Sequence, residues 1–140
     1  MKCYWQLAKT GTPLVLHALE TIKNLAWSYL LAVTIGATRP ELDAVFTQYS
    51  LTQYFTVIVT TENFTNSKPN PEPYLLTAQK LELPPAECVV IEDTITGILS
   101  AKVAGMPCIA LSNTYPADKL QKADYVAANY LEIISCIKQR

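Results

Sequence analysis

The stretch CVVIEDTITGILSAKVAG, from Cys88 to Gly105, decides the fold. It begins with four apolar residues, a run that is typical of a strand buried on both faces of a parallel sheet. Glu92 and Asp93 follow directly, and Thr94 is a residue type that caps helix starts. Small or apolar residues then recur up to Gly105, which stands where a helix C-terminus favours left-handed backbone. The stretch therefore predicts a strand, an acidic turn and a helix.

Strands and helices alternate along the rest of the chain as well. Such alternation indicates right-handed crossovers between parallel strands, and hence an α/β fold with a three-layer, Rossmann-like parallel sheet. No linker or repeat interrupts it, so we expect one domain over residues 1–140, with an atypical segment at 1–12. Further strands are expected at 30–35, 55–60, 107–111 and 125–126, and helices at 13–27, 39–49, 71–81, 94–104, 117–122 and 130–137.

Composition narrows the class of protein. The 140 residues carry 11 basic and 12 acidic side chains, which argues against a surface for nucleic acid or anionic membrane. No apolar run approaches a membrane span, and no signal peptide pattern follows Met1. The four cysteines show no close-paired spacing, so we expect reduced cysteines in a cytoplasmic protein.

Several motifs together resemble one known family. These are KPNPEPY from Lys68 to Tyr74, ECVVIEDT from Glu87 to Thr94, and Gly97. The combination resembles the haloacid dehalogenase superfamily, in the branch that holds phosphoglycolate phosphatases and β-phosphoglucomutases. The resemblance implies a hydrolase of the phosphatase type, acting on a small phosphorylated metabolite if active.

The adjacent carboxylates Glu92 and Asp93 are candidate metal ligands. Mg²⁺ prefers oxygen ligands and takes one or two carboxylates with water and substrate phosphate. Asp93 could equally cap the following helix, and spacing alone does not distinguish a metal ligand from a helix cap. The resemblance implies the metal role, with Asp93 as ligand and Glu92 assisting, so we expect a weak Mg²⁺ site.

Lys68 is the candidate catalytic residue. A lysine between a polar loop and a proline-rich helix start is usually only solvated. The resemblance implies a role in neutralising the nucleophile and the phosphoryl group, where a positive charge offsets gathered negative charge.

The family also places a serine or threonine after the strand at 30–34, where it binds phosphate. Our alignment puts Ile35 at that position, and isoleucine cannot donate a hydrogen bond. Thr34 and Thr38 lie nearby and are weak candidates for phosphate binding. Moving the alignment by one residue to Thr34 would turn the side chain to the opposite face of the sheet.

The family's nucleophile has no counterpart in this sequence. Relatives carry it in an Asp-x-Asp motif on the first strand, where it forms a phospho-enzyme. Here no aspartate precedes Asp43, and Ala8 and Thr10 occupy the two matching positions. The helical cap domain, which largely selects the substrate in relatives, is also missing. We expect the latter part of such an enzyme behind a short, unrelated or eroded start.

Three functions follow from these observations. The first is a family member with little or no phosphatase activity alone, because the nucleophile is missing. The second is a working Mg²⁺-dependent phosphatase with an unrecognised nucleophile or one supplied by another chain. The third is a non-catalytic binding or assembly module, which could form a homo-oligomer.

Loss of the family's first strand would leave a gap at the centre of the sheet. Each unpaired backbone group there would cost about 1–3 kcal/mol. The only candidate within the chain to fill the gap is the segment from Lys2 to Ala8, so we expect it to form the central strand. Closure of the two flanking strands, or an edge-to-edge dimer, are the alternatives.

Overall fold

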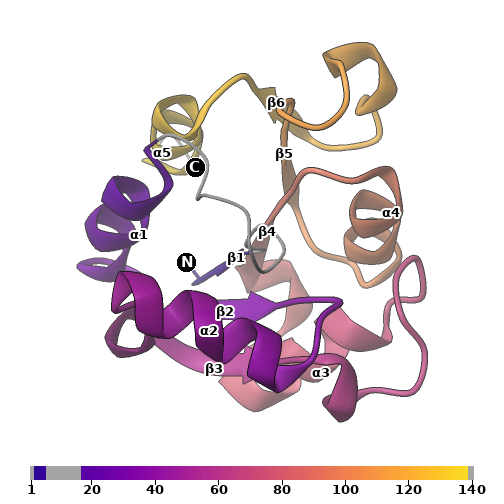
Figure 1. Cartoon of the computed structure of the whole chain (residues 1–140). Helices are drawn as coiled ribbons and strands as arrows, with labels where there is room; N and C mark the ends of the chain where they lie inside the picture. Colours follow the sequence, from indigo (N-terminus) through magenta and orange to yellow (C-terminus); the bar gives the residue numbers. More distant parts are fainter. Residues whose placement is uncertain (1, 6–16, 139–140) are drawn as a thin grey trace.

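The computed structural model describes residues 2–5 and 17–138 and shows an α/β fold built on a parallel sheet (Figure 1). Six strands pair in the order β3-β2-β1-β4-β5-β6, and every pair of neighbours is parallel. The predicted fold class is therefore confirmed. The strands are β1 (Lys2–Trp5), β2 (Leu31–Thr34), β3 (Phe55–Val59), β4 (Cys88–Glu92), β5 (Cys108–Leu111) and β6 (Tyr125–Ala127).

The first strand, β1, fills the centre of the sheet, as the sequence predicted. Tyr4 aligns with Ala32 of β2 on one side and with Val90 of β4 on the other. The flanking strands therefore do not close on one another, and their backbone groups find partners in β1. The expected strand continued to Ala8, and residues 6–8 lie outside the described part of the chain.

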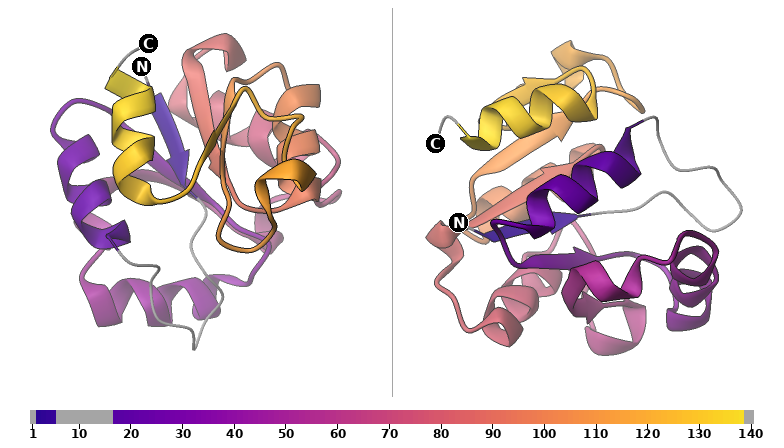
Figure 2. Two further views of the ribbon diagram at one scale, coloured as in Figure 1. Left: turned by 90° about the horizontal axis from the view of Figure 1, so that it is seen from above. Right: turned by 90° about the vertical axis from the view of Figure 1, so that its left-hand side faces the viewer.

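Helices cover both faces of the sheet, which gives the three layers (Figure 2). One face packs against α1 (Ala18–Ala26), α2 (Arg39–Tyr49) and α5 (Tyr130–Lys138), and the other against α3 (Glu72–Leu81) and α4 (Ile95–Val103). Two separate apolar cores result, one on each side. None of the described helices is long and apolar enough to cross a membrane.

The strands divide their side chains between the two cores by simple alternation. In β4, Val89 and Ile91 join the core under α1, α2 and α5, whereas Cys88 and Val90 join the core under α3 and α4. Glu92 is the next residue of the alternation, so its side chain points towards α3 and α4. This alternation decides which polar groups can meet at the end of the sheet.

Local sequence signals place most helix ends where they were predicted. Thr38 caps α2 and Thr94 caps α4, each accepting a bond from a backbone N–H in the first turn. Gly105 takes left-handed backbone with φ of 82°, as expected just after a helix. The helix expected at 117–122 is wrong: only a 3₁₀ turn, η4 (Ala117–Lys119), forms there, and Leu120 is its one buried neighbour.

Three of the four cysteines lie where the structure describes the side chain, and their predicted reduced state stays a prediction. Cys88 and Cys108 are buried in adjacent strands, and Cys136 is half-buried in α5. Burial raises the pKa of the Cys108 thiol, and the nearby Glu92 charge adds to the rise.

We predict that a proline in β1 destabilises the whole protein. Because β1 is flanked on both sides, the Tyr4 N–H faces a neighbouring strand, and Tyr4→Pro removes that donor. The orphaned carbonyl should lower the free energy of unfolding by at least about 1–3 kcal/mol. Thermal unfolding followed by circular dichroism measures the loss.

The matched control is Tyr4→Phe, which keeps the backbone donor in place. Deleting residues 1–5 removes the strand altogether and should abolish the cooperative transition. Equal melting temperatures for Tyr4→Pro and Tyr4→Phe would contradict a central position for β1.

Candidate functional site

The predicted site residues gather where the carboxyl ends of β2 and β4 flank β1. In open α/β sheets this edge is where ligands bind. Glu92 ends β4, Asp93 follows it, and Lys68 reaches the same place from the loop before α3. Three of the residues singled out in the sequence therefore lie together.

Glu92 is the centre of the cluster. Its side chain is fully buried, and its two carboxylate oxygens accept three side-chain hydrogen bonds. Tyr74 donates to Oε2 at 2.5 Å, Lys68 Nζ donates to the same oxygen at 3.2 Å, and Thr94 donates to Oε1 at 2.9 Å. A buried charge needs such partners, because transfer from water is otherwise very costly.

Lys68 connects the two strands that flank β1. Its ammonium group donates to the Glu92 carboxylate at the end of β4 and, also at 3.2 Å, to the backbone carbonyl of Thr34 at the end of β2. The Lys68 side chain keeps 10% of its surface exposed. The positive charge is therefore held at the carboxyl edge of the sheet by a side chain that is mostly buried.

Tyr74 is buried beside this ion pair and stays protonated. Burial raises the pKa of its hydroxyl well above the usual range, and the negative charge of Glu92 raises it further. The hydroxyl thus remains a hydrogen-bond donor throughout the ordinary pH range.

Gly97 in α4 is required by the position of Glu92. A Cβ atom at Gly97 would lie 2.0 Å from Cδ and 2.3 Å from Oε1 of the Glu92 side chain. Glu92 cannot move aside cheaply, because all three of its donors would be lost. The glycine therefore makes room for the carboxylate at the start of the helix.

Asp93 points away from this cluster. Its Oδ2 accepts a hydrogen bond from Thr114 at 2.6 Å, in the loop after β5, and its side chain is half-buried. Burial, and then the charges of Asp93 and Glu92, raise the pKa of Tyr130 in α5. Asp93 is the more accessible of the two adjacent carboxylates.

The two threonines predicted to bind phosphate have other partners. Thr34 is buried, and its hydroxyl meets the Thr77 hydroxyl of α3 at 2.7 Å. The Thr38 hydroxyl accepts from the Glu41 N–H within a capping box. Their phosphate role stays a prediction, and these contacts count against it. Thr34 instead contributes its backbone carbonyl, which holds Lys68.

The described residues offer only a partial set of ligands for a Mg²⁺ ion. They contain no group of three or more His, Cys, Asp or Glu side chains that could hold a metal. Glu92 is committed to its three donors, which leaves Asp93 as the available carboxylate. One carboxylate is within the usual range for Mg²⁺, provided that phosphate and water supply the remaining oxygens. The arrangement therefore fits Asp93 as ligand better than Glu92.

Sequence reasoning missed the roles of Tyr74 and Gly97, although both lie in the quoted motifs. An aromatic residue with a polar end, placed among the buried positions of a helix, is the signal that could have identified Tyr74. No sequence signal predicts which side chain approaches Gly97.

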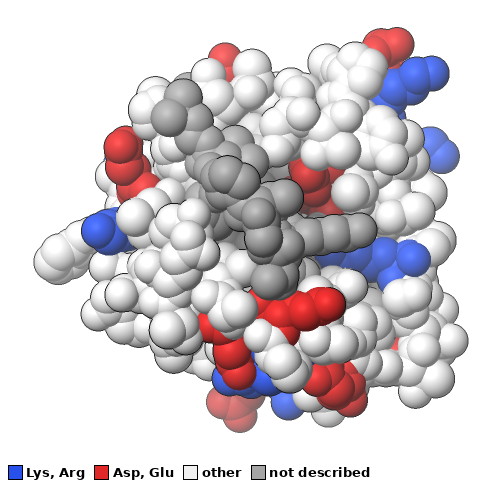
Figure 3. Space-filling view, viewed as in Figure 1, with Lys and Arg blue, Asp and Glu red and all other residues white. Residues whose placement is uncertain are grey.

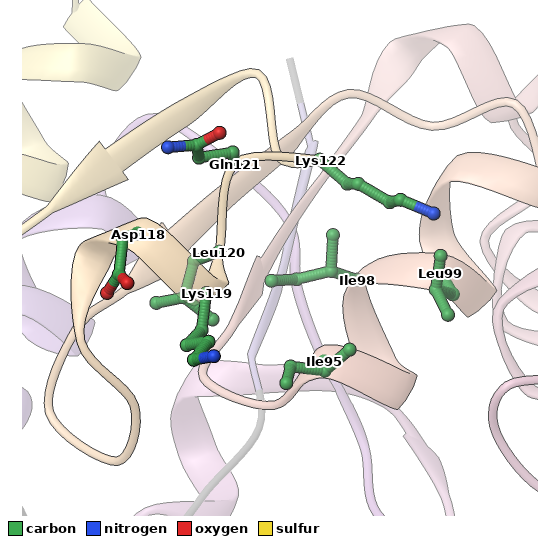
Figure 4. A pocket seen from close by; sticks show the side chains of 8 residues that line it. All are labelled: Ile95, Ile98, Leu99, Asp118, Lys119, Leu120, Gln121 and Lys122. Atoms are coloured by element: carbon green, nitrogen blue, oxygen red, sulfur yellow. The ribbon is translucent and has the colours of Figure 1, made fainter.

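A separate hollow of about 290 Å³ lies between α4 and η4 (Figure 4). Its lining does not include Lys68, Glu92 or Asp93, and it is distinct from the polar cluster. On the face of the molecule seen in Figure 3, the basic side chains are scattered and do not gather into one patch. The hollow is lined by Ile95, Ile98, Leu99, Asp118, Lys119, Leu120, Gln121 and Lys122.

Comparisons with known proteins identify the family to which this chain is similar. Residues 2–111 match the family described as haloacid dehalogenase-like hydrolases. The phosphoglycolate phosphatase of Salmonella typhi is 31% identical over 81% of this chain and 46% of its own length. The validoxylamine A 7'-phosphate phosphatase of Streptomyces hygroscopicus subsp. limoneus is 29% identical over 88% of this chain and 55% of its own. The chain thus spans about half the length of these curated relatives.

A solved structure shows the same fold. CbbY from Rhodobacter sphaeroides, in complex with phosphate, superposes with a TM-score of 0.77 at 26% identity. The match covers 86% of this chain and 56% of that chain. The resemblance proposed from the motifs around Lys68 and Glu92 is confirmed at the level of the family.

We predict that Gly97→Ala destabilises the protein by about 1–3 kcal/mol through overpacking against Glu92. The sign of the change in stability is informative, because helix propensity alone favours alanine over glycine by up to about 1 kcal/mol. Gly36→Ala is the matched control, because among the described residues beyond its chain neighbours no heavy atom lies within 4 Å of the added Cβ. Urea unfolding compares the two variants, and equal stability would contradict the contact.

We also predict that stability falls at alkaline pH. The raised pKa values of Tyr74 and Tyr130 mean that the unfolded state loses these protons first. Their contribution is complete below the unfolded value of about 10 and is lost as pH rises above it. Melting temperature measured against pH should therefore drop from about pH 10 upward.

Tyr130→Phe should make that alkaline fall shallower, because phenylalanine has no proton to lose in the unfolded state. Tyr125→Phe, at an exposed tyrosine, serves as the control and should leave the curve unchanged. Parallel curves for all three proteins would show that these buried hydroxyls do not govern the loss.

Proposed function

The chain belongs to the haloacid dehalogenase-like hydrolases, and from this premise we propose that it binds the phosphoryl group of a small phosphorylated metabolite with little or no hydrolysis alone. The phosphatase names of its relatives support the class of ligand. The missing nucleophile supports the low activity.

The observation that carries the proposal is the position of Lys68. Its ammonium group is held by the Glu92 carboxylate and the Thr34 carbonyl, at the edge of the sheet where ligands bind. A fixed positive charge at such a place attracts phosphoryl oxygens and needs little reorganisation when they arrive. Lys68 would therefore bind and orient the phosphoryl group.

Asp93 would hold a Mg²⁺ ion at the same edge of the sheet as Lys68. When bound, the ion would offset the negative charge of the phosphoryl oxygens. The affinity of Asp93 alone should be weak, since relatives add carboxylates from the first strand. Glu92 takes no part in this binding and instead keeps Lys68 in place.

Low turnover follows from the N-terminal segment. Ala8 and Thr10 stand where the family resemblance places the two aspartates, and neither side chain can form an acyl phosphate. Both residues lie outside the described part of the chain. We therefore propose that no phospho-enzyme accumulates.

The second candidate function is a working Mg²⁺-dependent phosphatase whose nucleophile comes from elsewhere. The two curated relatives are both phosphatases, which favours this alternative. Asp93 would then be essential for turnover.

The proposal predicts phosphate binding that depends on the buried ion pair. Lys68→Met combined with Glu92→Gln removes both charges together, so that neither is left buried alone. The affinity for phosphate, measured by ³¹P NMR titration, should fall at least about tenfold, because a charge-assisted hydrogen bond is lost. Arg39→Gln with Asp43→Asn removes an exposed ion pair and should leave phosphate binding intact.

Hydrolysis of p-nitrophenyl phosphate with Mg²⁺ separates the two candidate functions. We expect the wild type and Asp93→Asn to be equally slow. Calorimetry should show weak Mg²⁺ binding that Asp93→Ala removes. Robust turnover that Asp93→Asn abolishes would favour the working phosphatase, and phosphate affinity equal in the double variant and the wild type would refute the role of Lys68.

A further inference from the structure

We propose that Tyr74 is the positioning residue for Lys68: it sets where the ammonium group lies and how much of its charge is left for an anion. The second part rests on the proposed phosphate binding, and the first part does not.

Tyr74 contacts both members of the buried ion pair. Its hydroxyl donates to Oε2 of Glu92, the same oxygen that accepts from Lys68. Its ring lies beneath the ammonium group, with Lys68 Nζ 4.8 Å from the ring centre. A cation over an aromatic face at this distance is attracted by the ring. One side chain therefore holds the carboxylate and the ammonium in a common arrangement.

The side chain of Tyr74 is itself held in place. It is 1% exposed in α3, and one turn later Thr77 ties the same helix to β2. The Thr77 hydroxyl donates to the Pro73 carbonyl, so the Thr34 hydroxyl is the donor in the bond between the two threonines. The position of the ring is thus set by the packing of α3 on the sheet.

The shared oxygen explains how Tyr74 affects the charge of Lys68. Oε2 of Glu92 divides its accepting capacity between a neutral hydroxyl and an ammonium group. Without the hydroxyl, Oε2 would accept from Lys68 alone and neutralise it more completely. The ammonium group would then move towards Glu92 and offer less charge to a phosphoryl oxygen.

Tyr74→Phe tests this role, because phenylalanine keeps the ring and removes the donor. We expect the affinity for inorganic phosphate to fall about fivefold, the size of one ordinary hydrogen bond. The matched control is Thr77→Val, which removes a buried hydroxyl from the same face of α3 without touching Lys68. Thr77→Val should lower the melting temperature by a similar amount and leave phosphate affinity unchanged.

A direct view of Lys68 separates this inference from the proposed function. The ¹⁵N signal of the Lys68 ammonium group, assigned by its absence in Lys68→Arg, should shift in Tyr74→Phe and stay unchanged in Thr77→Val. If the wild type binds no phosphate but the signal behaves in this way, the proposed function fails and the positioning role stands. A signal at the same place in wild type and Tyr74→Phe overturns the positioning role.

The wild-type protein provides a test that needs no variant to fold. Because Lys68 Nζ lies over the ring of Tyr74, the ε-methylene protons of Lys68 should be shifted upfield by the ring current. They should also show a nuclear Overhauser effect to the ring protons. Lys68 protons at ordinary chemical shifts, with no such effect, overturn the proposal whatever the variants do.

Discussion

The buried carboxylate of Glu92 is the constraint on which this edge of the molecule depends. A fully buried charge is tolerated only when hydrogen bonds and an opposite charge replace the water that it loses. Here Lys68, Tyr74 and Thr94 supply them from the loop before α3, from α3 and from the start of α4. The carboxylate therefore brings together elements that lie far apart in the sequence.

The same carboxylate accounts for features that look local. The Thr94 hydroxyl caps α4 by accepting a hydrogen bond from the Gly97 N–H, and it donates a hydrogen bond to Glu92. Gly97 leaves the space into which Glu92 extends. The helix cap, the glycine and the ion pair are thus three consequences of one buried group. Lys68 extends the arrangement to β2 through the Thr34 carbonyl.

Local sequence signals predicted the fold, whereas the hydrogen-bond partners of individual side chains could not be predicted from the sequence. The helix at 39–49 was predicted with its observed ends, and in the structure a capping box of Thr38 and Glu41 fixes its start. The central place of β1 followed from the cost of unpaired backbone groups. The partners of Thr34, Thr38 and Glu92 depend on which face each side chain takes and on what packs there. Thr34 turned to α3, as alternation requires, so that its carbonyl and not its hydroxyl contributes to the site.

Replacing some of these residues tests folding, whereas replacing others tests chemistry. Lys68 and Glu92 need one another wherever this fold is stable, because each would otherwise be a poorly compensated charge. Their presence is explained whether or not the chain hydrolyses a phosphate ester. Asp93 is different, because it is half-buried and accepts its one described side-chain bond from a loop threonine, Thr114. Within the described part of the chain no buried charge depends on Asp93, so the consequence of replacing it is the measurement that bears on catalysis.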